Sequence, residues 1–135
     1  MPTILLLAAV LAAEGVSYVV VGSACLYLRG ERGPVRDIDA VPAPDRANLA
    51  RLHAVLTGLA LGGWCPPLRL LATADLVQVH TSYGKLDCLL HRGRRDWDSL
   101  VAGAEAFDVC GVAVLTAAAR DARALRSKFK DVPGE

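Results

Sequence analysis

The sequence has few aromatic residues and almost no net charge. Aromatic residues make up 5% of the chain, and the formal net charge at pH 7 is +1. Proteins that bind single-stranded nucleic acid commonly stack bases on exposed aromatic rings, so stacking is not expected to dominate binding. A net charge near zero gives no attraction between the whole molecule and a polyanion, so a nucleic-acid partner would need a local basic patch.

Cysteine pairs with metal-binding or redox spacing are absent. The four cysteines, Cys25, Cys65, Cys88 and Cys110, are scattered without a Cys-x-x-Cys motif, and two of them lie in apolar runs. This spacing excludes the common zinc sites and favours reduced, mostly buried thiols. We therefore expect a cytoplasmic protein.

No apolar run is long enough to suggest a membrane span. The run from Ile4 to Ala13 has ten apolar residues, whereas about 20 are needed to cross a bilayer. No lysine or arginine precedes it, and Glu14 and Gly15 follow where a signal-peptide cleavage site would stand. The sequence predicts a buried first helix and no membrane partner.

The order of the expected elements indicates one α/β (α+β) domain over residues 1–135, with a mixed β-sheet flanked by helices. An apolar content of 53% provides an aliphatic core. Continuous or alternating apolar runs predict strands, and apolar residues at helical spacing predict helices. The expected strands are 17–21, 35–41, 68–72 at a sheet edge, 76–81, 85–90, and 107–114 as a strand or hairpin. The expected helices are 3–14, 24–28, 46–61, 96–104 and 116–128.

Helix boundaries are indicated by capping residues. Thr3, Asp45 and Thr116 precede apolar helical runs and can cap them through their side-chain oxygens. Gly15 and the pair Gly62-Gly63 follow such runs and can end them.

Two acidic residues stand out in the second expected strand. After the apolar run Tyr18–Val21 and the pair Gly22-Ser23, thirteen residues intervene before Asp37-Ile38-Asp39. Residues two apart in a strand point to the same face, so Asp37 and Asp39 would project side by side. Two like charges about 4 Å apart repel by roughly 4 kcal/mol at an effective dielectric of 20, which predicts a shared cation. Oxygen ligands favour a hard ion, with Mg²⁺ first.

A third acid and a glycine-serine turn fit the same site. Asp87 lies inside the short apolar run of residues 84–90, and three carboxylates would converge if its strand lay beside that of Asp37 and Asp39. Gly22-Ser23 stands between a strand and a helix, where free backbone N–H groups favour an anion such as phosphate. Alternatively, this turn is an ordinary one with Ser23 as the helix N-cap.

These motifs, in this order, resemble the nucleotidyltransferase superfamily with the DNA polymerase beta-like fold. The first helix, the segment EGVSYVVVGSA and the late segment SKFKD are similar to small prokaryotic nucleotidyltransferase-like proteins, including the toxin–antitoxin and abortive-infection branches. The resemblance covers roughly residues 4–131.

The resemblance implies roles for the site residues. Asp37 and Asp39 would hold Mg²⁺ that bridges the phosphates of an NTP, and Asp87 would complete the site and help to activate an attacking hydroxyl. Gly22 and Ser23 would seat the terminal phosphates. The reaction would move a nucleoside monophosphate to a hydroxyl on a protein, an RNA or a small molecule.

The pattern departs from the family at two positions before Asp37. Many relatives carry Arg and Thr where this chain has Gly33 and Val35. Arg32, one position away, or Arg36 would replace the arginine, and Arg36 is taken as a nucleotide contact.

Other readings stay open. The acid pair could be a solvent-facing pair balanced by Arg36 or Arg32. The chain could also be a weakly catalytic or non-catalytic toxin–antitoxin component that mainly binds a cognate partner protein, or a phosphate- or metal-binding domain without transfer activity. The sequence does not name the acceptor, the base, the oligomer or the partner.

Basic and aromatic residues elsewhere have structural or functional interpretations. Arg92, Arg94 and Arg95 make either a solvated turn or a patch at the mouth of the site for a triphosphate or an RNA backbone. His80 is interpreted as a structural histidine within a strand, and Trp64 and Trp97 as core or interface anchors.

The last helix would carry a basic stripe that places Lys128 or Lys130 within reach of a nucleotide. The stripe comprises Arg120, Arg123, Arg126, Lys128 and Lys130.

Overall fold

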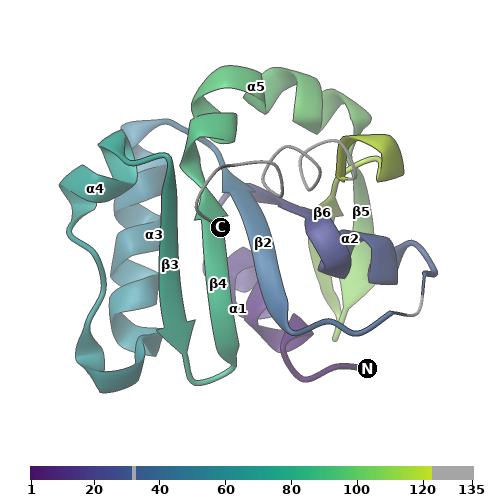
Figure 1. The fold of residues 1–135 in the computed structure, drawn as a ribbon, viewed down its shortest axis with the longest axis horizontal. Helices are drawn as coiled ribbons and strands as arrows, with labels where there is room; N and C mark the ends of the chain where they lie inside the picture. The colour runs from purple at the N-terminus through teal and green to yellow at the C-terminus, as the bar shows by residue number, and fades with distance from the viewer. Residues whose placement is uncertain (32, 123–135) are drawn as a thin grey trace, which may run out of the picture.

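A computed structural model describes residues 1–31 and 33–122 as a six-stranded mixed sheet with helices on both faces (Figure 1). The strand order is β3-β4-β2-β1-β6-β5. The predicted α/β class with a mixed sheet is confirmed. The strands are β1 (Tyr18–Val21), β2 (Asp37–Pro42), β3 (Leu76–Thr81), β4 (Gly84–Leu89), β5 (Glu105–Val109) and β6 (Val112–Thr116).

Helices form a layer behind the sheet and a partial layer in front of it. In Figure 1, α1 and α3 lie behind the strands, α2 lies in front, and α5 crosses the upper end. The front of β3, β4 and β2 thus carries none of these labelled helices directly over it. The helices are α1 (Leu5–Ala13), α2 (Gly22–Leu28), α3 (Arg46–Leu59), α4 (Leu68–Thr73) and α5 (Leu90–Gly103), with a 3₁₀ turn η1 (Leu61–Gly63).

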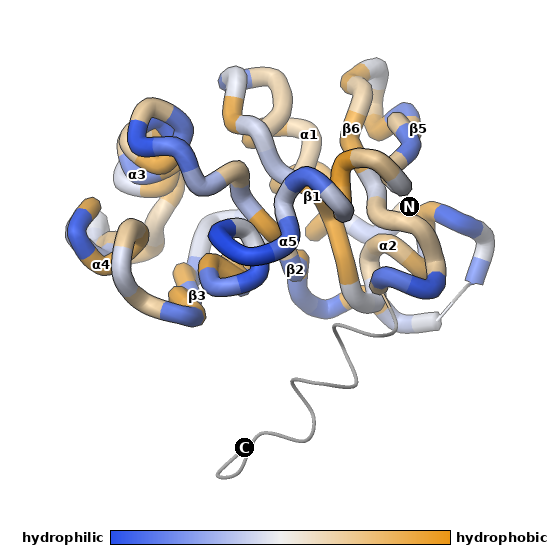
Figure 2. Tube along the Cα trace, turned by 90° about the horizontal axis from the view of Figure 1, so that it is seen from above, coloured by the Kyte–Doolittle hydropathy of each residue, from blue (hydrophilic) through white to orange (hydrophobic). Residues whose placement is uncertain are grey.

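The first helix is apolar on every side and largely buried, as the sequence predicts. It packs behind the sheet against β6 and β5. Figure 2 shows α1 in hydrophobic colours, whereas α5 is largely hydrophilic. Thr3 is not its cap, contrary to expectation. Ile4 holds the N-cap position without a side-chain hydrogen bond, and the carbonyl of Thr3, rather than its hydroxyl, accepts from the Leu6 N–H.

The cap of α3 is the predicted one and belongs to a larger buried network. The Asp45 side chain accepts a hydrogen bond from the backbone N–H of Asn48 at 3.0 Å. The buried Asn48 amide then accepts from the Ser17 N–H at 2.7 Å and donates to the carbonyls of Ser17 and Ala43 at 2.8 and 3.0 Å. These bonds fix α3 against the chain just before β1.

Residues 68–72 form the start of α4 and not the expected edge strand. Pro67 holds the N-cap position, and a proline costs nothing there because the first N–H groups of a helix have no intrahelical partner. Leu71 is fully buried and α4 packs against α3. The edge strand on this side is β3.

The helix after β4 begins six residues earlier than predicted. α5 starts at Leu90, directly where β4 ends, so Arg92, Arg94 and Arg95 are helical and not in a turn. Arg92 forms an ion pair with Asp96, one helical turn on, at 2.6 Å, and this pair supports the first turns.

Two predicted hairpins are confirmed, whereas one predicted helix cap is wrong. β3–β4 and β5–β6 are antiparallel pairs, and Gly111 turns the second with a φ of +83°. Thr116 lies in β6, where its hydroxyl bonds to the Val114 carbonyl, so it does not cap the last helix. That helix runs from residue 119 to the last described position, and Arg123, Arg126, Lys128 and Lys130 of its expected basic stripe, like the SKFKD segment, lie outside the described residues.

The core is aliphatic, as the composition predicts. Its largest fully buried side chains come from the first helix, the inner strands and the helices behind them, and include Leu5, Leu7, Leu11, Val19, Val20, Ile38, Leu56, Leu71 and Leu86. Over residues 1–31 and 33–122, no helix has the length and apolar character needed to cross a bilayer.

Candidate active site

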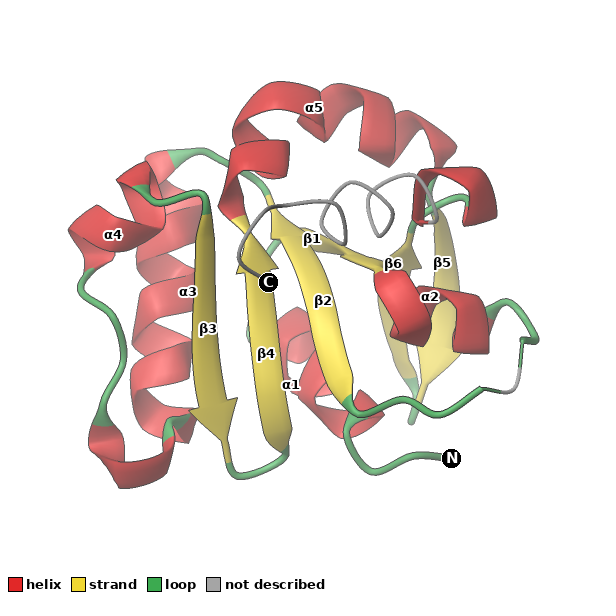
Figure 3. Cartoon of the chain, in the orientation of Figure 1, coloured by secondary structure: helices red, strands yellow, loops and turns green. Residues whose placement is uncertain are grey.

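The site is built where β2 and β4 run side by side, as Figure 3 shows. The two strands are parallel, and their register sets Asp39 opposite Asp87 and Asp37 opposite Lys85. Ile38 and Leu86, between them, are fully buried in the core. Because strand side chains alternate, Asp37, Asp39 and Asp87 share the other face, which is the face that carries α2.

Gly22 closes one side of this acidic cluster. It is the first residue of α2, follows β1 directly and has a φ of +68°. A β-carbon at this position would lie 2.2 Å from Asp39 Oδ2, so only glycine permits the observed approach. Val21, and not Ser23, is the N-cap residue of α2, so the alternative reading of Ser23 as an N-cap is wrong. Ser23 stands half-buried beside Gly22.

The cluster disfavours a charge on Asp39. Burial, followed by the Asp87 carboxylate with its hydrogen bond to Asp39 and then by Asp37, raises the pKa of Asp39 to about 7, and only Lys85 acts in the opposite direction. Near neutral pH, Asp39 is therefore partly protonated. A bound cation would favour the fully ionised form.

Lys85 supplies the cation that sequence reasoning missed. Its Nζ lies 3.5 Å from Asp37 Oδ2 and 3.8 Å from Asp87 Oδ1. The expected balancing residues were Arg36, which is exposed just before β2, and Arg32, which lies outside the described residues. The available signal was the spacing Lys85-x-Asp87, since residues two apart on a strand share a face.

One carboxylate oxygen in the cluster receives no hydrogen bond from the described part of the chain. Asp87 Oδ1 is buried, and no donor within the described residues reaches it, because 3.8 Å to Lys85 Nζ is too long for a hydrogen bond. A buried acceptor without a partner is costly, so a cation bound at this oxygen would be stabilising. The oxygen-only donor set and this orphaned oxygen fit Mg²⁺.

The arrangement nevertheless is not a preformed metal shell. Among the residues that the structure describes, no three His, Cys, Asp or Glu side chains are grouped so as to hold a metal ion. Lys85 pairs with both Asp37 and Asp87, and its ammonium occupies space among the carboxylates. The acids converge as a cluster around a lysine.

The polar face continues onto the edge strand β3. Gln78 stands opposite Asp87 and His80 opposite Lys85 in the antiparallel register, and both are exposed. His80 thus lies within a strand, as the sequence predicts, but its side chain is exposed. Both residues follow the alternation of β3, whose other face (Val77, Val79) is buried.

The arginine cluster of α5 is engaged within the protein. Arg92 is only 8% exposed and pairs with Asp96, and Arg94 donates to the carbonyls of Ala72 and Ala74 and to Asp75. These contacts anchor α5 to the end of α4. Arg95 is the most exposed of the three, so these arginines do not form the shared patch that was one of their two readings.

The two tryptophans differ in environment. Trp97 packs against the core, as expected for an anchor. Trp64 is 65% exposed and is therefore not a core residue.

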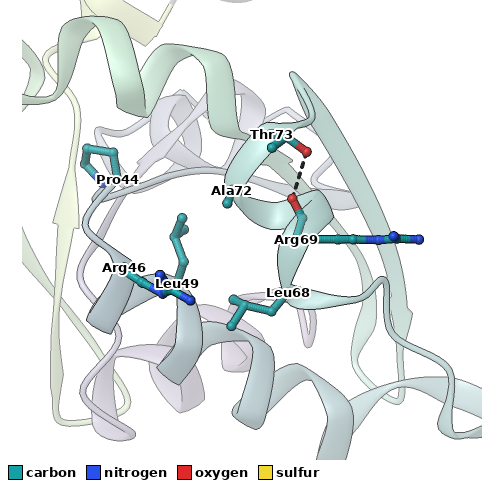
Figure 4. A pocket seen from close by; sticks show the side chains of 7 residues that line it. All are labelled: Pro44, Arg46, Leu49, Leu68, Arg69, Ala72 and Thr73. Carbon is teal, nitrogen blue, oxygen red and sulfur yellow. Dashed lines mark hydrogen bonds between the residues drawn. The ribbon is translucent and has the colours of Figure 1, made fainter.

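A separate cavity of about 410 Å³ lies between α3 and α4 and contains none of the predicted site residues. Figure 4 shows Leu49 and Leu68 directed into it, while the Arg69 side chain extends away. Its apolar lining, and the absence of a carboxylate among its lining residues, set it apart from the acidic cluster. The lining residues are Pro44, Arg46, Leu49, Leu68, Arg69, Ala72 and Thr73.

The six-stranded mixed sheet with its flanking helices matches a nucleotidyltransferase-like fold. A crystal structure from Thermotoga maritima, described as a "putative nucleotidyltransferase", superposes with a TM-score of 0.61 over 94% of this chain and 83% of that one. The two sequences are 14% identical, so this likeness concerns the fold. No protein-family model matches the sequence, and no curated protein matches it.

Proposed function

We propose that this protein is a Mg²⁺-dependent nucleotidyltransferase that moves a nucleoside monophosphate from an NTP to a hydroxyl group. The observation that carries the proposal is the placement of Asp39 and Asp87 side by side on parallel strands, with Gly22 packed directly against the Asp39 side chain. The nucleotidyltransferase-like fold supports the same reaction class.

The acids have distinct roles in this proposal. Asp37 and Asp39 bind Mg²⁺, and Asp87 completes the site. The ion, when bound, stabilises negative charge on the attacking and leaving oxygens of an in-line displacement. Asp87, whose Oδ1 receives no hydrogen bond from the described residues, orients the acceptor hydroxyl and accepts its proton.

The reaction balances without a further co-reactant. The acceptor oxygen forms a bond to the α-phosphorus, the bond from that phosphorus to the β-phosphate oxygen breaks, and pyrophosphate leaves. The acceptor proton passes to Asp87 and then to solvent. Gly22 and Ser23 seat the terminal phosphates beside the acids, and Arg36, which is exposed just before β2, contacts the nucleotide.

The test is transfer of label from α-³²P NTPs in the presence of Mg²⁺. Each of the four NTPs is offered with an RNA pool, a protein extract, small-molecule hydroxyl compounds and the protein alone. The proposal expects labelled product with the wild type and at least a roughly 100-fold loss in Asp39→Asn and Asp87→Asn. Asp98→Asn is the matched control, because Asp98 is exposed on α5 and the substitution changes the net charge equally. Equal activity in all four proteins would contradict the proposal.

A second candidate function is that of a toxin–antitoxin component that mainly binds a partner protein. The observation in its favour is the exposure of two large apolar side chains, Leu61 and Trp64, which are 59% and 65% exposed in the segment between α3 and α4. A stoichiometric partner that stays bound to Asp39→Asn and is lost from Trp64→Ala would favour this function. Partner loss in Asp39→Asn alone would contradict it.

A further inference from the structure

The cluster of carboxylates contains its own cation. Lys85 extends from β4 onto the same face as the acids and is in register with Asp37. Its ammonium contacts Asp37 and Asp87 at once, from the strand position two residues before Asp87. The Lys85 side chain is 29% exposed, so this pairing is only partly screened by water.

A divalent ion and this ammonium would need the same oxygens. Asp87 Oδ1, the buried acceptor to which the described residues donate no hydrogen bond, is the atom that Lys85 approaches at 3.8 Å, and Asp37 Oδ2 lies at 3.5 Å. Neither distance is a close hydrogen bond, so the lysine offsets part of the negative charge without forming a hydrogen bond to either oxygen. The lack of a three-ligand metal group among the described residues agrees with this placement.

We infer that Lys85 is a resident counter-ion that competes with the divalent cation, so the protein alone binds that cation weakly and Lys85 must leave the carboxylates for the cation to bind. This inference rests on the proposed function. It deepens that function by assigning Lys85 as a positioning residue that sets cation affinity. A bound nucleotide offers the displaced ammonium new anionic partners, so cation and nucleotide bind together more readily than either alone.

The test is direct binding of Mn²⁺, without nucleotide, measured by electron paramagnetic resonance. Removal of a like charge within 4 Å of the ligand oxygens predicts at least about tenfold tighter Mn²⁺ binding in Lys85→Met than in the wild type. Lys85→Gln, which keeps a polar side chain, is the second variant if Lys85→Met folds poorly, and it carries the same expectation. Arg69→Met is the matched control, since it removes one positive charge from the exposed face of α4.

A double variant tests whether any gain in Mn²⁺ affinity depends on the carboxylates of the cluster. Lys85→Met combined with Asp39→Asn is expected to lose the tight Mn²⁺ site, and Mn²⁺ is expected to raise the melting temperature of Lys85→Met more than that of the wild type. A tight site that survives in the double variant lies elsewhere and overturns the inference.

The outcomes separate this inference from the proposed function. Equal or weaker Mn²⁺ binding by both Lys85 variants overturns the role of Lys85, whereas nucleotidyl transfer by the wild type would still stand. Tighter binding in both variants together with no transfer by the wild type would support competition at the cluster and remove only the proposed function.

Discussion

The Asp39 carboxylate lies so close to Gly22 that a β-carbon on residue 22 would stand 2.2 Å from Asp39 Oδ2. This contact joins the end of β1 to the middle of β2 and fixes where the acid points. Gly22→Ala would also force a side chain into a backbone with a φ of +68°.

Gly22→Ala is therefore expected to damage both the fold and the site. We expect a loss of about 2 kcal/mol or more in the free energy of unfolding, measured by urea denaturation, and loss of NTP binding. Gly33→Ala is the control, because a β-carbon there meets nothing within 4 Å. Similar stability and nucleotide binding in the two variants would mean that the approach of Asp39 to Gly22 is not needed.

The sequence could predict this cluster of acids because the alternation of side chains along a strand determines which residues share a face. Asp37-Ile38-Asp39 and Leu86-Asp87-Cys88 each carry a carboxylate next to a buried apolar residue, so one face is acidic wherever the two strands pair. What the sequence could not supply was the strand order, which depends on contacts far apart in the chain, and with it the pairing of Asp39 with Asp87. The spacing Lys85-x-Asp87 already places Lys85 on the face of Asp87, and only its pairing with Asp37 depends on the strand order.

Fold predictions were wrong where tertiary contacts outweigh local signals. Residues 68–72 carry β-compatible leucines after two prolines, but burial of Leu71 against α3 favours a helix. Arg92 and Arg94 suggested a turn, yet ion pairs and backbone acceptors hold them in α5. Aliphatic core positions and the Asp45 cap, which depend on neighbours in sequence, were predicted correctly.

Asp39→Asn is expected to stabilise the protein while abolishing transfer. The folded-state pKa of Asp39 is about 7, above its ordinary value of 3.8, so the folded protein binds the proton more tightly than the unfolded chain does. In EDTA, the free energy of unfolding of the wild type should therefore fall as the pH rises from about 4 to about 7 and then level off. The asparagine side chain of the variant cannot ionise, so the variant should lack this component and exceed the wild type at pH 8 by roughly 1–3 kcal/mol.

Chemical denaturation at pH 4, 6 and 8 measures this difference. The gap between Asp39→Asn and the wild type should be smallest at pH 4 and should narrow at pH 8 when Mg²⁺ is added, because a bound cation favours the ionised wild-type site. Asp98→Asn, on the exposed side of α5, should show no such dependence. A gap that is constant with pH would show that ionisation of Asp39 does not destabilise the fold.

Gly93→Ala is expected to loosen the packing of α5 over the end of β2. A β-carbon at residue 93 would lie 2.2 Å from the Pro42 carbonyl oxygen, which belongs to rigid backbone, so the helix would have to move. We expect a loss of about 1–3 kcal/mol in the free energy of unfolding. Gly58→Ala, in α3 with nothing within 4 Å, should instead stabilise by about 0.5–1 kcal/mol because alanine is the better helix former.

The test is the sign of the stability change in each glycine variant, which differential scanning calorimetry measures as a shift in melting temperature. Opposite shifts in melting temperature support the tight contact between α5 and β2. A gain in Gly93→Ala equal to that in Gly58→Ala would mean that α5 packs farther from Pro42 than the structure shows.

The four cysteine thiols should react at widely different rates, which probes the sheet without reference to activity. Cys110 is exposed in the β5–β6 turn, Cys65 is half-buried, and Cys25 and Cys88 are buried. Burial, with lesser contributions from Asp87 and Cys65, also raises the pKa of Cys88 to about 12, so its reactive thiolate is scarce at pH 8. With a thiol-specific chromogenic reagent, we expect one fast thiol, lost in Cys110→Ser, and a slower one, lost in Cys65→Ser. Cys25 and Cys88 should react only at the rate at which the protein unfolds, and fast labelling of Cys88 would show that β4 is not held between β2 and β3.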